Sequence, residues 1–200
     1  MNNRVAQWLR PFEPGRLPDE YDAKRLVRQY GINVPEGKRL DAGEMMDDPG
    51  SGSLFAVKVC SGSILHKTDA QGVMLNVDPG SMEACLKQMH KRFPDNSLLI
   101  EEQLPFSGPE FIVGVINDPS MGHAVMAGAG GLFTEIYKDT ACRLVPCSLR
   151  DAQDMIDELI LAPVFDSFRG IYLDRDKLAQ VILKVSTLAQ DMGQSLNQLD

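Results

Sequence analysis

The sequence predicts a mixed α/β fold in which short strand pairs alternate with helices, and three observations indicate it. Apolar residues repeat with a helical period in residues 19–30. Apolar runs of strand length come in pairs separated by turns, at 54–59 with 72–77 and at 97–103 with 110–117. No Gly-x-Gly-x-x-Gly fingerprint or phosphate-binding P-loop motif is present. Paired strands between helices favour two α+β lobes over one parallel sheet.

Composition bounds the class of protein. The chain has 200 residues, of which 44% are hydrophobic, so it can bury a sizeable core. Its formal net charge of -8 provides no basic surface for nucleic acid or for an anionic membrane. Because there is no apolar run of membrane-spanning length and no signal peptide, we expect a cytoplasmic protein. The four cysteines lack Cys-x-x-Cys spacing, which favours reduced thiols and disfavours a zinc site.

The first lobe begins after an irregular N-terminus. Residues 1–17 show no sustained period, and we expect them to form an arm. Residues 19–30 have acidic residues at their start, an apolar stripe and a glycine after their end, which is the pattern of one helix. Residues 41–53 are rich in acids, Gly and Pro, which predicts an exposed loop or at best a short helix. A helix capped by Ser81 is expected to run through Phe93.

The second lobe is predicted to hold more strands and two helices. A strand at 124–127 ends in the glycine-rich segment 128–131. Ser148 with Asp151 resembles a capping box, so a helix is expected to run from there to about residue 160. Asp174 is expected to cap a last helix with an apolar stripe.

Two residues of the first lobe are candidates for phosphate chemistry. Lys58 interrupts an apolar strand, where an unpaired ammonium is costly, so either its end reaches solvent at the strand edge or an anion pairs with it. His66 lies in the turn between two strands. A neutral imidazole suits proton or phosphoryl transfer, although a surface histidine in a polar loop is the simpler interpretation of this position alone.

Two further charged groups leave similar alternatives open. Glu101, Glu102 and Glu110 lie where the chain passes between the expected lobes, and they can accept hydrogen bonds from an adenine amine or ribose hydroxyls or remain solvated. Arg143 follows the glycine-rich segment and offers a planar fork for phosphate oxygens, while Glu135 or Asp139 could assist a magnesium ion. A tight turn followed by a charged strand explains the same pattern without a ligand.

Taken together, several segments resemble the ATP-grasp domain of ADP-forming acyl-CoA synthetases, typified by ADP-forming acetyl-CoA synthetase β subunits and more distantly by succinyl-CoA synthetase β chains. The resemblance covers residues 18–200. Its segments are Tyr21-Asp22-Ala23-Lys24 to Tyr30-Gly31-Ile32-Asn33-Val34-Pro35, Val57-Lys58-Val59, Ile64-Leu65-His66-Lys67-Thr68-Asp69, Gly72-Val73, Gly108-Pro109-Glu110-Phe111-Ile112-Val113-Gly114, Gly130-Gly131-Leu132-Phe133-Thr134-Glu135 and Lys138-Asp139 to Arg143-Leu144-Val145-Pro146.

The resemblance implies a fold of two α+β lobes that clamp a nucleotide. It places Lys58 on the phosphates of ATP or ADP, Glu102 near the adenine, Glu110 in the nucleotide pocket and Arg143 on the phosphate side. It makes His66 the catalytic residue that relays a phosphoryl group, with magnesium as cofactor. The implied reaction converts acyl-CoA, ADP and phosphate reversibly to acid, ATP and CoA. It needs a CoA-binding α subunit or domain as partner, so a hetero-oligomer is expected.

The sequence departs from the family pattern at three points. Gln71 stands where the family has glycine, the residues around Ser61-Gly62-Ser63 lack the usual proline, and relatives continue past the position of Asp200 into a segment with a metal-binding asparagine. The metal ligands are therefore unknown. We expect an arm at 1–17, a small lobe at 18–97 and a second lobe at 98–200 that is truncated at its C-terminus. The alternative function is a non-catalytic nucleotide-binding regulatory module, such as the ATP-grasp-like part of a protein acyltransferase.

Overall fold

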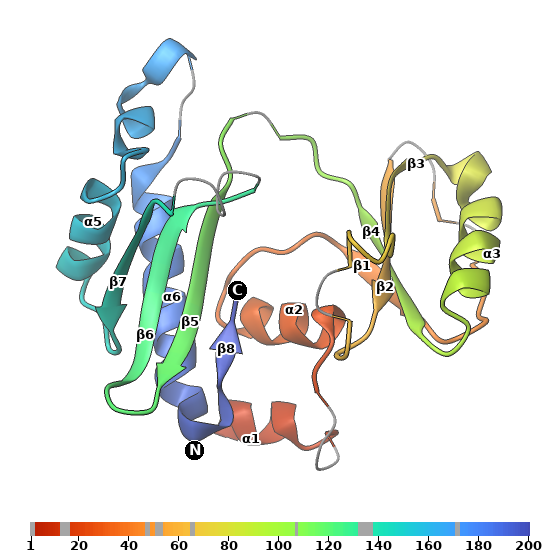
Figure 1. Cartoon of the computed structure of the whole chain (residues 1–200), viewed down its shortest axis with the longest axis horizontal. Helices are drawn as coiled ribbons and strands as arrows, with labels where there is room; N and C mark the ends of the chain where they lie inside the picture. The colour runs from red at the N-terminus through yellow and green to blue at the C-terminus, as the bar shows by residue number, and fades with distance from the viewer. Residues whose placement is uncertain are drawn as a thin grey trace. The chain divides into compact units, whose positions relative to one another are not determined.

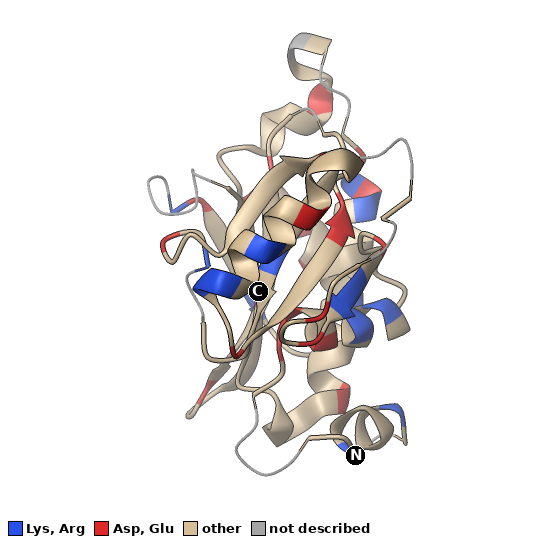
Figure 2. Ribbon diagram, turned by 90° about the vertical axis from the view of Figure 1, so that its right-hand side faces the viewer, with Lys and Arg blue, Asp and Glu red and all other residues tan. Residues whose placement is uncertain are grey.

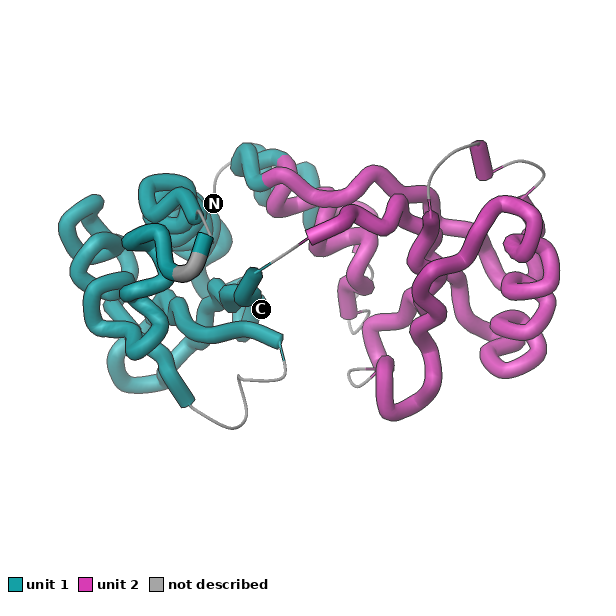
Figure 3. Tube along the Cα trace, turned by 90° about the horizontal axis from the view of Figure 1, so that it is seen from above, with its two compact units in different colours: residues 1–9, 29–32, 107–200 teal, residues 10–28, 33–106 magenta. Residues whose placement is uncertain are grey.

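The chain forms two compact units, which are described separately (Figure 3). Unit 1 comprises residues 1–9, 29–32 and 107–200, and unit 2 comprises residues 10–28 and 33–106. The computed structural model describes residues 3–12, 17–46, 49–50, 54–64, 67–106, 108–131, 138–170 and 173–200.

Unit 2 is built on a four-stranded antiparallel sheet with the order β1-β4-β2-β3. The strands are β1 (Gly37–Leu40), β2 (Phe55–Cys60), β3 (Val73–Val77) and β4 (Ser97–Glu102). Helix α3 (Met82–Arg92), entered through the short 3-10 helix η1 (Pro79–Ser81), covers one face of the sheet (Figure 1). Helix α2 (Glu20–Gln29) has all but its last residue in this unit.

The alternation of side chains along β2 separates the core from a charged face. Val57 and Val59 are fully buried and belong to the apolar cluster that α3 completes. Because successive strand side chains point to opposite faces, Lys58 between them points to the other face of the sheet. There it meets Glu20, the first residue of α2.

Unit 1 contains a second antiparallel sheet, with the order β7-β6-β5-β8. Its strands are β5 (Phe111–Asp118), β6 (Gly122–Ala129), β7 (Thr140–Leu144) and β8 (Gln198–Leu199). Its helices are α1 (Asn3–Leu9), α5 (Leu149–Asp157) and α6 (Arg175–Met192), with short 3-10 helices η2 (Ala162–Asp166), η3 (Phe168–Gly170) and η4 (Gly193–Ser195). Helices α5 and α6 lie against one face of this sheet (Figure 1).

The helices of unit 1 begin where the sequence signals indicate. Ser148 and Asp151 form a reciprocal capping box at the start of α5. The carboxylate of Asp174 accepts a hydrogen bond from the backbone N–H of Lys177 at the start of α6. The apolar stripe of α6 then buries Ile182, Val185 and Leu188.

The mixed α/β prediction is confirmed, and the expected strands and helices are present to within a few residues. Two expected boundaries differ from the structure. The arm expected at 1–17 contains helix α1, which buries Val5 in unit 1. The division expected after residue 97 falls just after the first residue of β4, yet β4 pairs with both β1 and β2, so unit 2 continues to residue 106.

Charged residues of both signs occur along the described part of the chain (Figure 2). Single strands can carry one sign, since the charged residues of β1 are Lys38 and Arg39 and those of β4 are Glu101 and Glu102. None of the helices in the described part of the chain is both long and apolar enough to cross a membrane.

Candidate functional site

Lys58 belongs to a network of three lysines and two glutamates in unit 2, which we call the Lys–Glu cluster. Its members are Glu20, Lys24, Lys58, Lys67 and Glu101. The Lys58 ammonium donates to Glu20 Oε1 at 2.7 Å and to Glu101 Oε2 at 2.9 Å. Lys24 donates to the same two carboxylates, at 2.7 Å to Glu20 Oε1 and at 2.6 Å to Glu101. Lys67 donates to Glu20 Oε2 at 2.6 Å.

The cluster favours the charged forms of Glu20 and Lys58 although both side chains are partly buried. Burial alone opposes ionisation of Glu20, but hydrogen bonds from Lys24, Lys58 and Lys67 outweigh it and hold the pKa of this carboxyl well below its usual range. Burial likewise tends to lower the pKa of Lys58, whereas Glu20 and Glu101 together raise it. The carboxylate of Glu20 is further favoured by its position at the N-terminus of α2.

The carboxylates of Glu20 and Glu101 thus provide part of the negative charge that we expected an anion to bring to Lys58. The sequence analysis named Glu101 together with Glu102 at the crossover but did not predict that Glu101 contacts Lys58. Lys58 lies opposite Leu99 in the β2–β4 ladder, and Glu101 is two residues further along the same face. The side chain of Glu101 is only 3% exposed. Strand alternation could have identified it, had the pairing register been known.

Glu102 lies on the other face of the same sheet. Its strand neighbours on that face are Ile100 and the cross-strand partner Phe55, both in contact with the apolar core. With them it lines a surface hollow of about 310 Å³ beside β1 and the following loop. The structure therefore does not bring Glu102 and Lys58 together within unit 2.

His66 lies outside the described residues, but the turn that follows it is well defined. Gly72 closes this turn with a hydrogen bond from its N–H to the carbonyl of Lys67, at 2.7 Å. A Cβ at Gly72 would come within 2.5 Å of Val59 Cγ1, so the turn packs tightly against β2. Gln71 adopts a φ of 53°, a left-handed conformation in which glycine is the least strained residue. The departure from the family pattern at Gln71 therefore falls at a strained position.

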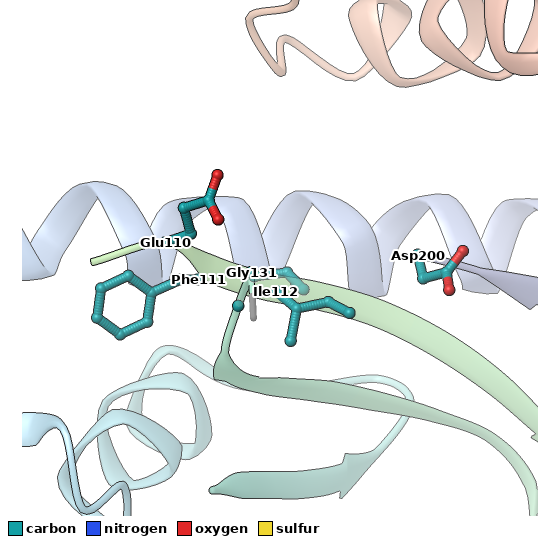
Figure 4. A pocket seen from close by; sticks show the side chains of 7 residues that line it. Glu110, Phe111, Ile112, Gly131 and Asp200 are labelled. Atoms are coloured by element: carbon teal, nitrogen blue, oxygen red, sulfur yellow. The ribbon is translucent and has the colours of Figure 1, made fainter. Parts of the chain in front are cut away.

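Glu110 lies at the edge of a hollow of about 460 Å³ in unit 1 (Figure 4). Its carbonyl accepts a hydrogen bond from the N–H of Gly130 at 2.7 Å. Gly131 has a φ of +61°, and a Cβ there would lie 2.0 Å from Glu110 Oε2. Position 131 therefore requires glycine, because the Glu110 side chain occupies the space that a Cβ would need. Sequence reasoning found both features without predicting that they meet.

Asp200 is a lining residue of the Glu110 hollow that sequence reasoning missed. It follows β8, which pairs with β5 close to Gly114. A Cβ at Gly114 would lie 2.6 Å from the carbonyl oxygen of Leu199, so the glycine permits the close approach of the two backbones. Figure 4 shows the carboxylates of Glu110 and Asp200 along β5, with the Phe111 ring directed away from them.

Arg143 lies on β7 and is not among the residues that line the Glu110 hollow. It pairs across the sheet with Val125, which is fully buried. Its guanidinium forms a bidentate pair with Glu158 at the end of α5, with one distance of 3.1 Å. The hydrogen bonds that Arg143 donates to Glu158 raise the pKa of Arg143 and lower that of Glu158.

Glu135 and Asp139 were suggested as magnesium ligands, and the structure describes only Asp139. Glu135 lies outside the described residues. Asp139 is only 7% exposed, and its carboxylate accepts hydrogen bonds from the backbone N–H groups of Ile160 and Leu161, at 2.7 and 3.0 Å. Asp139 therefore holds the chain after α5. Within the described ranges, no group of three or more His, Cys, Asp or Glu residues is arranged to bind a metal ion.

Comparison with known proteins identifies the class to which this fold and these residues belong. A family model described as an ATP-grasp domain matches residues 13–200. The chain is 37% identical to subunit beta of acetate–CoA ligase (ADP-forming) II of Pyrococcus furiosus, covering 90% of this chain and 81% of that subunit. It is also 37% identical to subunit beta of enzyme I of the same organism, covering 95% of this chain and 88% of the subunit.

Solved structures agree with this result. A crystal structure of a protein from Pyrococcus horikoshii has 33% sequence identity and a TM-score of 0.82, covering 96% of this chain and 86% of that chain. The dinucleotide-forming acetyl-coenzyme A synthetase 1 of Ca. Korarchaeum cryptofilum, in complex with coenzyme A and Mg-AMPPCP, has 25% identity and a TM-score of 0.71. It covers 90% of this chain and 81% of that chain.

The chain belongs to the ATP-grasp family, and within it to the ADP-forming acid–CoA ligases of the β-subunit type. The family and the fold expected from the sequence are therefore confirmed. Some members carry this region within a longer chain. In the acetate–CoA ligase (ADP-forming) I of Archaeoglobus fulgidus, the chain covers 26% of the protein. The name "subunit beta" in the Pyrococcus furiosus proteins implies that those proteins assemble with another subunit.

Proposed function

We propose that this chain is the nucleotide-binding part of an ADP-forming acid–CoA ligase, which interconverts acyl-CoA, ADP and phosphate with acid, ATP and CoA. The observation that carries the proposal is its 37% identity to β subunits of such ligases over most of their length. The placement of Lys58 supports it, because an ammonium presented from a buried strand and kept protonated by carboxylates is suited to binding phosphate.

The nucleotide-binding residues proposed are Lys58, Glu102, Glu110 and Arg143. Lys58 binds phosphate oxygens, and Glu102 accepts a hydrogen bond from the base or ribose. Glu110 completes the nucleotide pocket in unit 1, where Gly130 and Gly131 fix its position. The assignment of Arg143 to the phosphate side rests on the family resemblance and requires its guanidinium to exchange Glu158 for a phosphate oxygen.

His66 is proposed as the residue that carries the phosphoryl group. A neutral imidazole nitrogen attacks the phosphorus, the bond to the leaving oxygen breaks, and the N–P bond that forms is broken again when the group is passed on. The assignment rests on the family motif and on the sequence position of His66 between β2 and Lys67. Lys67 is anchored to Glu20, so the chain next to His66 is tied to the Lys–Glu cluster.

Magnesium is proposed as the metal that accompanies the nucleotide. Mg²⁺ in nucleotide sites is typically held by one or two carboxylates together with phosphate oxygens, and it neutralises phosphate charge. The chemistry of the Glu110 hollow fits this requirement, because the carboxylates of Glu110 and Asp200 both line it. These two side chains are the residues of this chain that would hold the ion.

A CoA-binding α subunit or domain is proposed as partner, which would make the active protein a hetero-oligomer. The names of the Pyrococcus furiosus subunits support this proposal. The acid and inorganic phosphate are the small-molecule substrates, and the acyl group is recognised by the partner. The proposed place of action is the cytoplasm.

Transfer of labelled phosphate from ATP tests the proposed function. Incubation of the chain with γ-labelled ATP and magnesium should label the protein with an acid-labile phosphate, as expected for phosphohistidine. His66→Ala should abolish the labelling. His90→Ala is the matched control, because His90 contacts the backbone of Gly43 and Glu44 and has no proposed role in transfer.

The alternative, a non-catalytic nucleotide-binding module, predicts a different result in the same assay. Such a module would bind ATP, visible as a thermal shift, without becoming labelled even when its partner is present. Absence of both a thermal shift and labelling would contradict nucleotide binding altogether and favour a purely structural subunit.

A further inference from the structure

The ammonium groups of the Lys–Glu cluster differ in how many of their hydrogen-bond donors are engaged. An ammonium group has three N–H donors. Lys24 makes three contacts, to Glu20 Oε1 and to both oxygens of Glu101. Lys58 makes two contacts, and Lys67 makes one. Lys58 and Lys67 therefore have N–H donors that no described residue engages.

Glu20 holds these two lysines close to each other. Lys58 binds its Oε1 and Lys67 binds its Oε2, at 2.7 and 2.6 Å, so a single carboxylate bridges the two ammonium groups. The Lys58 and Lys67 side chains are 22% and 18% exposed, which leaves both accessible from solvent. Three ammonium groups face two carboxylates in the cluster, so an excess of one positive charge remains. That charge favours an anion at the two lysines with donors to spare.

We propose that Lys67 is a second phosphate-binding residue, acting together with Lys58, and that Glu20 is the positioning residue that holds their ammonium groups in place. The ligand is a phosphate group, either the terminal phosphate of the nucleotide or inorganic phosphate. Lys24, whose three donors are engaged, braces Glu20 against Glu101 and does not contact the ligand. This inference deepens the proposed function and rests on it for the identity of the ligand.

The rival explanation is that the cluster is an ion-pair network that only stabilises unit 2. A network of that kind would not require Lys58 and Lys67 to keep donors that no described residue engages. It would also predict that removing Lys67 changes stability without changing ligand affinity. The two explanations therefore differ in measurable binding.

Titration calorimetry with three ligands provides the test. Mg-ATP, adenosine and inorganic phosphate are titrated into the wild-type chain and into Lys67→Met, Lys67→Arg and Lys87→Met. Loss of a charge-assisted hydrogen bond in Lys67→Met should weaken Mg-ATP binding on the order of tenfold to a hundredfold and leave adenosine affinity unchanged. Lys67→Arg, which keeps the charge, should retain most of the affinity. Lys87 pairs with Glu83 on the exposed side of α3, so Lys87→Met is the control and should bind like the wild type.

The role of Glu20 is tested by a double-mutant cycle on Mg-ATP affinity. If Glu20 acts by positioning Lys67, the effects of Glu20→Gln and Lys67→Met should be strongly non-additive, whereas those of Glu20→Gln and Lys87→Met should add. A merely structural role of Glu20 would change stability but would not couple specifically to Lys67 in binding.

The outcomes separate this inference from the proposed function. If the wild type binds Mg-ATP and folded Lys67→Met binds it equally well with no coupling to Glu20, the assignment of Lys67 is overturned. If the wild type does not bind Mg-ATP, the proposed function fails. The titrations with inorganic phosphate then test whether Lys67 binds phosphate. Phosphate binding that Lys67→Met weakens supports a free-phosphate site, and no phosphate binding to the wild type overturns the inference as well.

Discussion

Gly131 determines where the carboxylate of Glu110 lies. Its φ of +61° is a left-handed conformation, and any Cβ would overlap Glu110 Oε2. Gly131→Ala should therefore cost about 1–2 kcal/mol of stability from backbone strain and, in addition, displace the Glu110 side chain. We expect it to weaken Mg-ATP binding, measured by calorimetry alongside thermal unfolding.

Gly122→Ala is the matched control for Gly131→Ala. Gly122 also has a positive φ, +84°, but no atom lies within 4 Å of the position of its Cβ. The control should lose a similar amount of stability and keep its nucleotide affinity. Equal affinity in both variants would show that Glu110 does not contribute to binding.

The Lys–Glu cluster makes stability depend on pH through Glu20. Its pKa is lowered from an ordinary value of 4.5 because three lysines surround the carboxylate. A depressed pKa in the folded state contributes stability that is present above pH 4.5 and is lost as the pH falls towards the folded pKa. Urea unfolding of the wild type should therefore show falling stability below pH 4.5.

Glu20→Gln should flatten this acid dependence, since the substituted amide does not titrate. The variant should be less stable than the wild type at pH 7, where Lys24, Lys58 and Lys67 lose their shared partner, and the difference should shrink as the pH falls. An identical acid slope in the two proteins would mean that Glu20 does not account for it.

At the scale of elements, Asp139 links β7 to the end of α5. Each of its carboxylate oxygens accepts one backbone N–H, from Ile160 or Leu161, in a buried position. Asp139→Asn replaces one acceptor with an NH₂ donor and leaves one of these N–H groups without a partner. We expect a loss of about 1–3 kcal/mol in the free energy of unfolding. Exposed Asp166 provides the control, since Asp166→Asn should have little effect.

The same variant tests the early hypothesis that Asp139 binds magnesium. Because both oxygens are engaged by the backbone, Asp139→Asn should leave the magnesium dependence of ATP binding unchanged. A loss of magnesium dependence at unchanged stability would restore Asp139 as a metal ligand.

Elements with strong local signals were predictable, and those that depend on distant pairing were not. The stripe and cap of α6 and the apolar run of β2 are visible in a few consecutive residues. Strand β1, with the sequence Gly-Lys-Arg-Leu, has no apolar alternation and forms because β4, some sixty residues later, provides its hydrogen-bond partners. For the same reason Lys58 was recognised as unusual in an apolar strand, while its contact with Glu101 on β4 was not predicted.

At the scale of the whole molecule, the order of motifs identified the family, but the sequence did not reveal how the chain is divided. Unit 1 takes in residues 1–9 and 29–32 as well as residues 107–200. Contacts between residues more than 150 positions apart create this division, and no local pattern encodes them. The buried side chains of Val5 and Tyr30 are therefore contributed to unit 1 from the N-terminal part of the chain.

Tyr30 offers a direct test of this organisation. It is 8% exposed, its hydroxyl donates to Asp191 Oδ2 at 2.9 Å, and the guanidinium of Arg4 lies 5.1 Å from the centre of its ring. Nearby, Lys184 donates to the carbonyl of Gly31 at 2.6 Å. Segment 29–32 is therefore held against α6 by named contacts within unit 1. Tyr30→Phe should lower the stability of unit 1 by about 1–2 kcal/mol.

Hydrogen exchange can localise the effect of Tyr30→Phe. Amides of α6 should exchange faster in the variant than in the wild type, while those of β2 in unit 2 should change less, because local openings differ between parts of a protein. Tyr21→Phe is the control, since the Tyr21 ring lies near Arg25 and Arg39 in unit 2 and has no contact with α6 among those described. Equal acceleration in β2 and α6 would show that the two units open together.

The pH dependence provides an independent check on the same contact. Burial and the hydrogen bond to Asp191 raise the pKa of Tyr30 to about 12 from an ordinary value of 10.0. A raised pKa in the folded state means that the stabilisation is complete below pH 10 and is lost as the pH rises towards 12. The wild type should therefore lose stability over this interval relative to Tyr30→Phe, measured by urea unfolding. Parallel curves for the two proteins would mean that the tyrosine hydroxyl is not held by Asp191 in solution.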